Sequence, residues 1–216
     1  MTYLQLVNEV LTRLREETVS TLAGADDVVV TLVKDFVNDA KHLVEDSHQW
    51  NALRNEWTIS TVAGTDNYSL TGAGNYARIE YILMANGQYV TEQRLQLLRQ
   101  LSSEDPTQQQ TPTYYSVNGI DASGDLRLKV YPNPDAVYAL NVYGFKRQAD
   151  LVADNDVLLT PSKPVLYYAL ALAARERGEV GGQTAAEVFS LAQQYTSNAV
   201  ALDATMNDLD NIWMTV

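Results

Sequence analysis

The stretch that decides the fold is "LRLKVYPNPDAVYALNVYGF", residues 126–145. Two runs within it alternate apolar and polar residues with a period of two, which is the pattern of half-buried β-strands. The apolar residues of the first run share one face of the strand: Leu126, Leu128 and Val130. A Pro-Asn-Pro-Asp corner separates the runs, and prolines cannot donate the hydrogen bonds of a strand ladder. We therefore predict a β-hairpin here, and neither of its strands contains an obvious catalytic group.

The period of two continues on the amino-terminal side of this stretch. "WTIST" and "YSL" flank a turn at residues 64–67, and "RIEYILM" and "QYV" flank Asn86-Gly87, so each pair predicts a hairpin. A short helix is predicted after Thr91, and the polar segment "SSEDPTQQQTP" predicts an exposed loop before the strand "TYYSV". These elements predict a β-rich insertion domain with one short helix over residues 57–156.

Both ends of the chain have the three- and four-residue spacing of apolar side chains that predicts amphipathic helices. Capping-box patterns open the first and the last helix: Thr2 with Gln5, and Thr184 with Glu187. The predicted helices run from Thr2 for about 14 residues, from Asp26 or Asp27 to about His48, from Thr160-Pro161 to about Gly178, and onward from Thr184.

These elements predict an α+β fold class. The N- and C-terminal helical pairs, residues 1–56 and 157–206, are expected to form one four-helix bundle. The β segment 57–156 is then a central antiparallel insertion that protrudes from the bundle, and residues 207–216 form a C-terminal tail.

Composition and charge exclude several classes of protein. The chain has 216 residues, 46% of them hydrophobic, no cysteine and a formal net charge of −12. This composition fits a folded protein without disulfides or thiolate metal sites, and no apolar run reaches the roughly 18 residues of a membrane span. The N-terminus lacks the basic and apolar blocks of a signal peptide. The negative charge disfavours tight nucleic-acid binding, which depends on Lys and Arg neutralising phosphates.

We find no pattern that predicts catalysis. His42 and His48 are six residues apart on a predicted helix and so point in different directions, which does not suit a shared metal. "TGAGNY", residues 71–76, lacks the Lys-Ser/Thr of a phosphate-binding loop, and residues 154–156 lack the glycine and glutamate that a calcium loop requires downstream. We expect no enzymatic activity, no cofactor and no metal site.

Two features instead suggest contacts with other proteins. Tyrosine, which combines an apolar ring with a polar tip and is common at interfaces, occurs 13 times and gathers in the β region and the third helix. Ordinary strand composition is the alternative explanation. The second feature is the end of the chain, "NDLDNIWMTV", which is apolar where free termini are normally polar. Such a tail folds back on its own bundle or docks into a partner, and we favour the partner.

Several stretches, in this order, carry a likeness to a known family. They are "YLQLVNEVLTRLREETVSTL", then "VKDFVNDAKHLVEDSHQWNALRNEWTIST", then "TPTYYSVNG" leading to "LRLKVYPNPDAVYALNVYGFKR", and finally "LVADNDVLLTP" with "ALAARERGE". With them the chain resembles the head-to-tail adaptor (connector) proteins of tailed bacteriophages, of the tail tubular protein A type found in podoviruses. The Tyr-Pro-x-Pro-Asp-x-x-Tyr corner within this layout is the most telling part of the likeness.

The resemblance implies a structural protein of the virion neck, assembled in the host cytoplasm and not bound to a membrane. It implies a homo-oligomeric ring of twelve subunits that binds the portal protein on one side and the tail nozzle or tube protein on the other. The ring encloses a channel through which genome DNA passes without specific binding, and we expect acidic side chains to line that channel.

We assign interface residues by combining this adaptor role with the tyrosine-rich β region and the apolar end of the chain. We expect the portal-docking tail to use Ile212, Trp213, Met214 and Val216. We expect the β region to dock on the tail protein through Tyr114, Tyr115, Tyr131 and Tyr138. One alternative is a carbohydrate- or receptor-binding virion module, with its site in the loop "SSEDPTQQQTP" and its neighbours. Another is an enzyme with an unrecognised carboxylate pair.

Overall fold

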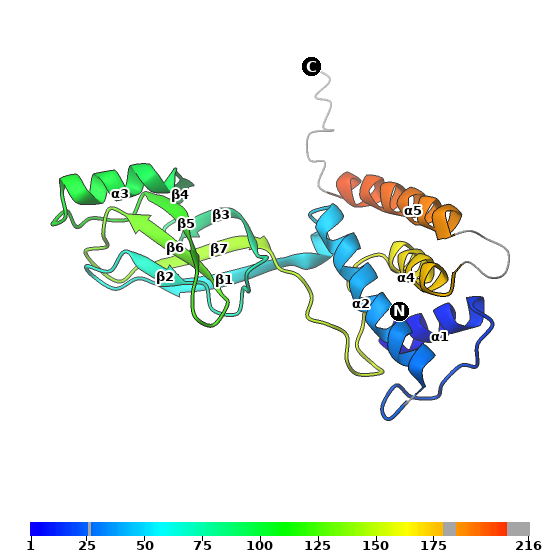
Figure 1. Cartoon of the computed structure of the whole chain (residues 1–216). Helices are drawn as coiled ribbons and strands as arrows, with labels where there is room; N and C mark the ends of the chain where they lie inside the picture. Colours follow the sequence, from blue (N-terminus) through cyan, green and yellow to red (C-terminus); the bar gives the residue numbers. More distant parts are fainter. Residues whose placement is uncertain (26, 179–184, 207–216) are drawn as a thin grey trace, which may run out of the picture. The chain divides into compact units, whose positions relative to one another are not determined.

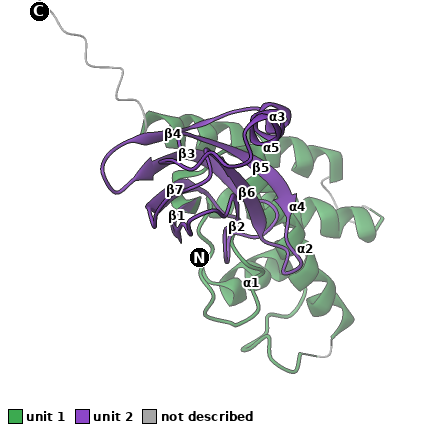
Figure 2. Ribbon diagram, turned by 90° about the vertical axis from the view of Figure 1, so that its left-hand side faces the viewer, with its two compact units in different colours: residues 1–53, 148–216 green, residues 54–147 purple. Residues whose placement is uncertain are grey.

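The computed structural model describes residues 1–25, 27–178 and 185–206, and the chain divides into two compact units (Figures 1 and 2). Unit 1 consists of Met1–Leu53 and Gln148–Val216, and unit 2 of Arg54–Arg147. Because unit 1 contains both ends of the chain, unit 2 is inserted within it. Each unit has a hydrophobic core of its own.

Unit 1 is helical. Its elements are α1 (Tyr3–Arg13), α2 (Val28–Ser47), the 3-10 helix η1 (Asn51–Leu53), α4 (Ser162–Glu176) and α5 (Ala185–Thr205). The capping box predicted at Thr2 and Gln5 is confirmed. The Thr2 side chain accepts a hydrogen bond from the Gln5 backbone N–H, and the Gln5 side chain accepts one from the Thr2 backbone N–H. The Asp27 carboxylate likewise accepts from the Val29 N–H and caps α2.

Helix α4 lies at the centre of unit 1 and packs against α1, α2 and α5. Its buried face includes Val165 and Ala169, which are fully shielded from solvent together with Leu6 of α1 and Val37 of α2. The ring of Trp50, just before η1, is buried in the same core, and its indole N–H donates to the Val44 carbonyl.

The segment 148–161 completes unit 1 without regular structure. The Asn38 amide donates to the Leu151 carbonyl and accepts from the Leu151 N–H, which ties the segment to α2. The Asp154 carboxylate accepts from the Thr21 hydroxyl and the Leu22 N–H. Residues 148–156, which the sequence pattern grouped with the β region, therefore lie in the helical unit.

Unit 2 is built on a seven-stranded sheet in the order β1-β7-β3-β4-β5-β6-β2. The strands are β1 (Arg54–Ser60), β2 (Asn67–Ser69), β3 (Arg78–Met84), β4 (Tyr89–Glu92), β5 (Tyr114–Ile120), β6 (Leu126–Tyr131) and β7 (Ala139–Phe145). The pair β4/β5 is parallel and the other strand pairs are antiparallel. Helix α3 (Leu95–Glu104) packs on β5 and β6.

The sheet curls toward a barrel that does not quite close. Its two edge strands, β1 and β2, follow each other in the chain and line a common cavity of about 320 Å³. Alternate residues of the strands fill the interior, and Leu128, Leu140 and Val142 are fully buried there. The predicted apolar face of β6 is confirmed, with Leu126 and Val130 also buried.

The predicted fold class is wrong. The described residues form a mixed helix and sheet structure with five α-helices and a seven-stranded, nearly closed sheet, not a four-helix bundle with a small antiparallel insertion. The β region has its own core, and one of its strand pairs is parallel. In unit 1, the central helix α4 contacts α1, α2 and α5.

Two of the predicted hairpins are also wrong, although their strands exist. Strand β6 pairs with β5 and β2, whereas β7 pairs with β1 and β3, so the Pro-Asn-Pro-Asp corner carries the chain across the sheet. Strands β1 and β2 are not paired with each other either. The alternating pattern determines which face of a strand is buried but not which strand lies beside it. The predicted hairpin of β3 and β4 is confirmed.

Candidate interaction surfaces

The four tyrosines that the sequence analysis singled out gather near the corner of unit 2. Tyr114 and Tyr131 lie opposite each other in the β5/β6 register, Tyr115 is the next residue of β5, and Tyr138 directly precedes β7. Tyr115 and Tyr131 are only 3% and 8% exposed, whereas Tyr114 is 37% exposed. The two buried rings stabilise the sheet, and a docking role for these residues stays a prediction.

Tyrosine hydroxyls in this group hold the neighbouring polar loop against the corner. The Tyr131 hydroxyl donates to the Gln108 side chain. The Thr111 hydroxyl donates to the Tyr138 oxygen over 3.0 Å, and the Tyr138 hydroxyl donates to the Asp135 carboxylate over 2.7 Å. The loop that would form the site of a carbohydrate-binding module is thus tied to the sheet by side-chain hydrogen bonds.

The second predicted interface is the portal-docking tail. Ile212, Trp213, Met214 and Val216 lie outside the described residues. Their proposed role stays a prediction from the sequence.

A second row of tyrosines crosses the strands β7, β3 and β4. The rings of Tyr143 and Tyr81 are stacked, with centroids 4.7 Å apart and planes inclined by 24°. Tyr81 and Tyr89 form an edge-to-face contact, with ring centroids 6.0 Å apart. Tyr81 and Tyr143 lie directly opposite each other in the β3/β7 register, which brings their rings together.

These three tyrosines are among the thirteen of the chain, and the sequence alone predicts no separate role for them. Their spacing in the sequence has no distinguishing feature. Only the pairing of β3 with β7, two strands that are far apart in the chain, makes them neighbours.

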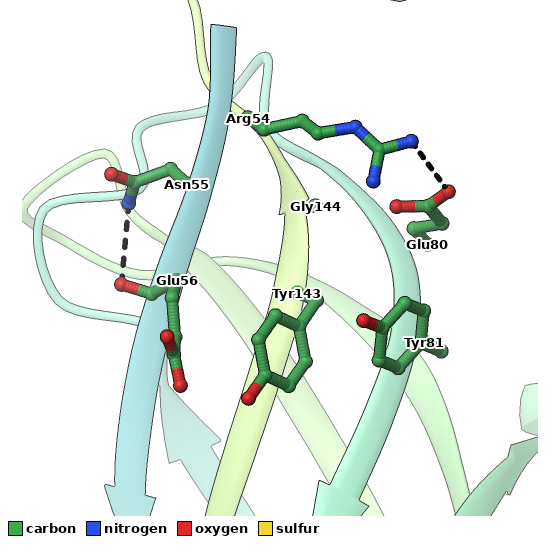
Figure 3. A pocket seen from close by; sticks show the side chains of 7 residues that line it. All are labelled: Arg54, Asn55, Glu56, Glu80, Tyr81, Tyr143 and Gly144. Atoms are coloured by element: carbon green, nitrogen blue, oxygen red, sulfur yellow. Dashed lines mark hydrogen bonds and ion pairs between the residues drawn. The ribbon is translucent and has the colours of Figure 1, made fainter. Parts of the chain in front are cut away.

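An open cavity of about 230 Å³ lies beside the stacked tyrosines (Figure 3). Its lining comes from three adjacent strands: Arg54, Asn55 and Glu56 of β1, Glu80 and Tyr81 of β3, and Tyr143 and Gly144 of β7. The Arg54 guanidinium pairs with the Glu80 carboxylate over 3.2 Å at one end. At the other end the Glu56 carboxylate makes no ion pair within the part of the chain that the structure describes.

Glu56 interacts directly with the tyrosine row. Its carboxylate is directly opposite Tyr143 in the β1/β7 register. Because the carboxylate accepts a hydrogen bond from the Tyr143 hydroxyl, it raises the pKa of that hydroxyl above its usual value. The cavity therefore presents one negative charge beside two tyrosine rings.

Gly144 allows β7 to lie close to β3 at this cavity. A Cβ atom on Gly144 would be 2.2 Å from the Arg78 carbonyl oxygen, a distance that no side chain tolerates. The register between β3 and β7 shifts at this point, between Ile79 and Tyr81. Glycine at position 144 is therefore needed for the strand approach next to the stacked rings.

A cluster of charged side chains lies in unit 1, separate from these surfaces. The side chains of Lys41 and Glu45 are fully buried, and their Nζ and Oε2 atoms are 3.5 Å apart. Lys41 also donates to the Gln148 carbonyl over 2.8 Å, and the His42 Nε2 atom lies 2.8 Å from the Asp150 carboxylate. Burial raises the pKa of Glu45, and the positive charges of Lys41 and His42 oppose that rise.

Formal charge is distributed unequally between the two units. Unit 1 contains 18 acidic and 7 basic residues, a net −11, whereas unit 2 contains 9 acidic and 8 basic residues, a net −1. The helical unit therefore carries almost all of the excess negative charge.

Two further observations concern the described residues alone. Residues 1–25, 27–178 and 185–206 contain no group of three or more His, Cys, Asp or Glu side chains that could hold a metal ion. Among the same residues, no helix is long and apolar enough to cross a membrane.

The comparison with known protein families decides what kind of protein carries these surfaces. The family model described as SU10 adaptor protein matches residues 1–213, nearly the whole chain. The chain belongs to the SU10 adaptor protein family. This confirms the resemblance to phage head-to-tail adaptors that the sequence carries. A comparison with curated proteins gave no match.

Membership of the SU10 adaptor family determines the general role. The chain is a bacteriophage adaptor protein, a structural component of the virion that interacts with other virion proteins. The surfaces described above are therefore candidates for contacts with other proteins.

Proposed function

We propose that this adaptor forms a ring of twelve identical subunits in the neck of the virion. In this proposal the ring binds the portal protein on one side and the tail nozzle or tube protein on the other, and it encloses the channel for genome DNA. The role is structural and involves no catalysis and no cofactor. The subunits assemble in the host cytoplasm.

The division into two units, each with its own core, is the observation that carries this proposal. A helical unit and a sheet unit that are independently packed can each present a surface to a different neighbour. An adaptor between two other assemblies needs at least two such surfaces, in addition to the contacts between its own subunits.

The charge distribution supports a channel that DNA passes without binding. We propose that acidic side chains of unit 1, which carries a net −11, face the lumen of the ring. Negative charge repels the phosphates of DNA and leaves no counterions to be released by binding.

The proposal is tested by measuring the mass of the purified protein alone and after mixing with the portal protein. A complex that contains the portal and about twelve copies of this chain is expected. If the chain remains monomeric both alone and with the portal, the proposed ring is wrong. A second measurement tests the channel: purified rings are expected not to retain duplex DNA at low salt, and strong retention contradicts the acidic lining.

A further inference from the structure

The cavity beside the stacked tyrosines has the properties of a socket for a basic side chain. Glu56 supplies a carboxylate that has no ion-pair partner among the described residues, and the Tyr143 and Tyr81 rings supply aromatic surface. Guanidinium groups bind carboxylates and stack on tyrosine rings, and arginine and tyrosine are enriched at interface hot spots. At about 230 Å³ the cavity has several times the roughly 30 Å³ that one water molecule occupies, which is enough for a guanidinium group.

The same features disfavour a sugar ligand at this place. The unpaired negative charge of Glu56 instead favours a cation.

Unit 2 also presents an exposed arginine in an unusual position. Arg94 is the N-cap residue of α3, where Ser, Thr, Asp or Asn is normally preferred, and its side chain makes no capping hydrogen bond. It is exposed, and it forms no ion pair within the described part of the chain. A positive charge at this end of a helix is also disfavoured by the helix dipole, and a carboxylate from outside would relieve that conflict.

An exposed apolar side chain accompanies this arginine. Leu97, in the first turn of α3 and three residues after Arg94, is 41% exposed. Arg94 and Leu97 together match the socket, which offers a carboxylate at its end and tyrosine rings along its side.

The socket and the arginine lie on different sides of unit 2. Helix α3 packs on β5 and β6, and the strands β7, β3 and β4 separate β5 from β1 in the sheet. Helix α3 and strand β1 accordingly lie across the unit from each other in both views (Figures 1 and 2). Two complementary patches on different sides of one molecule produce a head-to-tail contact, and such contacts generate rings when the rotation closes.

We infer that the Glu56–Tyr143–Tyr81 socket of one subunit receives Arg94 and Leu97 of the next subunit in the ring. This inference rests on the proposed ring and identifies the surfaces that join its subunits. Unit 2 thereby makes the subunit contact, and the acidic unit 1 is not required for it.

Chemical crosslinking of paired cysteines in assembled particles tests this contact directly, because the natural chain has no cysteine. An Arg–Glu pair holds its Cα atoms farther apart than a disulfide allows, so virions assembled with the double variant Glu56→Cys/Arg94→Cys are treated with a bismaleimide long enough to span that gap and analysed by denaturing electrophoresis. A ladder of crosslinked multimers is expected. Each single variant, and the control pair Glu56→Cys/Gln88→Cys, which combines Glu56 with an exposed turn residue, are expected to remain monomeric.

Charge reversal gives a second readout that does not depend on crosslinking. Glu56→Arg or Arg94→Glu alone is expected to weaken association between subunits at least about tenfold, since each variant places like charges together. The double reversal Glu56→Arg/Arg94→Glu is expected to recover most of that loss. Circular dichroism of each variant verifies that it is folded.

The outcomes separate this contact from the proposed function. If the particles contain the chain as a multimer but the double cysteine variant gives no ladder, the contact is wrong and the ring stands. Dimers from Glu56→Cys alone indicate a two-fold contact and also overturn it. If Glu56→Arg blocks incorporation while Arg94→Glu has no effect, the socket receives another virion protein and the inference fails. Particles without any multimer of the chain overturn the proposed ring itself.

Discussion

Replacing Lys41 by methionine tests how much the buried charge pair contributes to the stability of unit 1. Methionine keeps most of the apolar stem of lysine, so the change removes the charge without leaving a large cavity. It leaves the Glu45 carboxylate buried without its partner 3.5 Å away and removes the hydrogen bond to the Gln148 carbonyl. We expect the free energy of unfolding of unit 1 to fall by about 3–5 kcal/mol at pH 7.

The burial of both side chains determines this magnitude. An exposed lysine–glutamate pair contributes about 1 kcal/mol or less, because water screens the two charges. Lys41 and Glu45 have no exposed side-chain area, so the figure for breaking a buried pair applies, toward its lower end because His42 Nδ1 stays 3.4 Å from the Glu45 carboxylate. Asp150, 3.7 Å from the Lys41 ammonium, is 62% exposed and is therefore hydrated by solvent when the lysine is removed.

The effect of Lys41→Met also depends on pH in a definite direction. In the folded protein the pKa of Glu45 is raised, so ionising this carboxyl costs stability as pH rises through its unfolded and then its folded pKa. Without Lys41 the folded pKa rises further, and the cost at neutral pH increases. The stability difference between the natural protein and the variant is therefore expected to shrink as pH falls toward about 4, the ordinary pKa of glutamate.

Urea unfolding followed by far-ultraviolet circular dichroism measures this loss, because four of the five α-helices among the described residues lie in unit 1. Lys146→Met is a matched control at an exposed lysine of unit 2 and is expected to change stability by less than about 0.5 kcal/mol. Lys41→Met/Glu45→Leu, which removes both charges, is expected to recover most of the lost stability. A single variant within about 0.5 kcal/mol of the natural protein, or a loss that stays the same from pH 7 to pH 4, refutes the reasoning.

Two further substitutions have definite expected outcomes. Gly144→Ala is expected to destabilise unit 2 by about 1–3 kcal/mol, because the new methyl group would be 2.2 Å from the Arg78 carbonyl oxygen. Hydrogen exchange of peptides from β3 and β7 measures this loss, and an unchanged exchange rate contradicts the strand geometry. Asp154→Asn is expected to loosen the 148–161 segment, because hydrogen bonds from Thr21 and Leu22 lower the pKa of the Asp154 carboxyl. A carboxyl whose pKa is lowered in the folded state stabilises the fold at pH values above its unfolded pKa of about 3.9, and this contribution is lost as pH falls through the folded pKa. The variant is therefore expected to unfold at a lower temperature than the natural protein at pH 7, and at the same temperature at pH 2.

The helices and strands of this protein were predicted from its sequence more accurately than their arrangement in space. The helix caps Thr2 and Asp27 accept hydrogen bonds from backbone N–H groups in the first turn of their own helices, so they could be predicted from local patterns. The alternation of apolar and polar residues in 126–131 likewise identifies the buried face of β6. Strand partners could not be predicted from local patterns, because β7 pairs with β1 and β3, which are distant in the chain. The assumption that neighbouring strands pair led to the wrong hairpins and, with them, to the wrong fold class.

The same limit applies to the candidate surfaces. Tyrosine-rich composition suggested that the β region docks on a partner through these side chains, but Tyr115 and Tyr131 are buried, and the docking role of the group stays a prediction. The Tyr81–Tyr143 stack depends on the β3/β7 register, and the nearby cavity depends on β1 as a third strand. No local pattern contains that information. The family, in contrast, was recognisable from the order of stretches along the whole chain.

An image reconstruction of the neck of a virion that carries this chain tests the central claim most directly. We predict a closed ring of identical copies between the portal and the tail, with each sheet unit in contact with its neighbour and the acidic helical units facing the channel. A neck in which this polypeptide is absent, or is present without ring symmetry, contradicts the account.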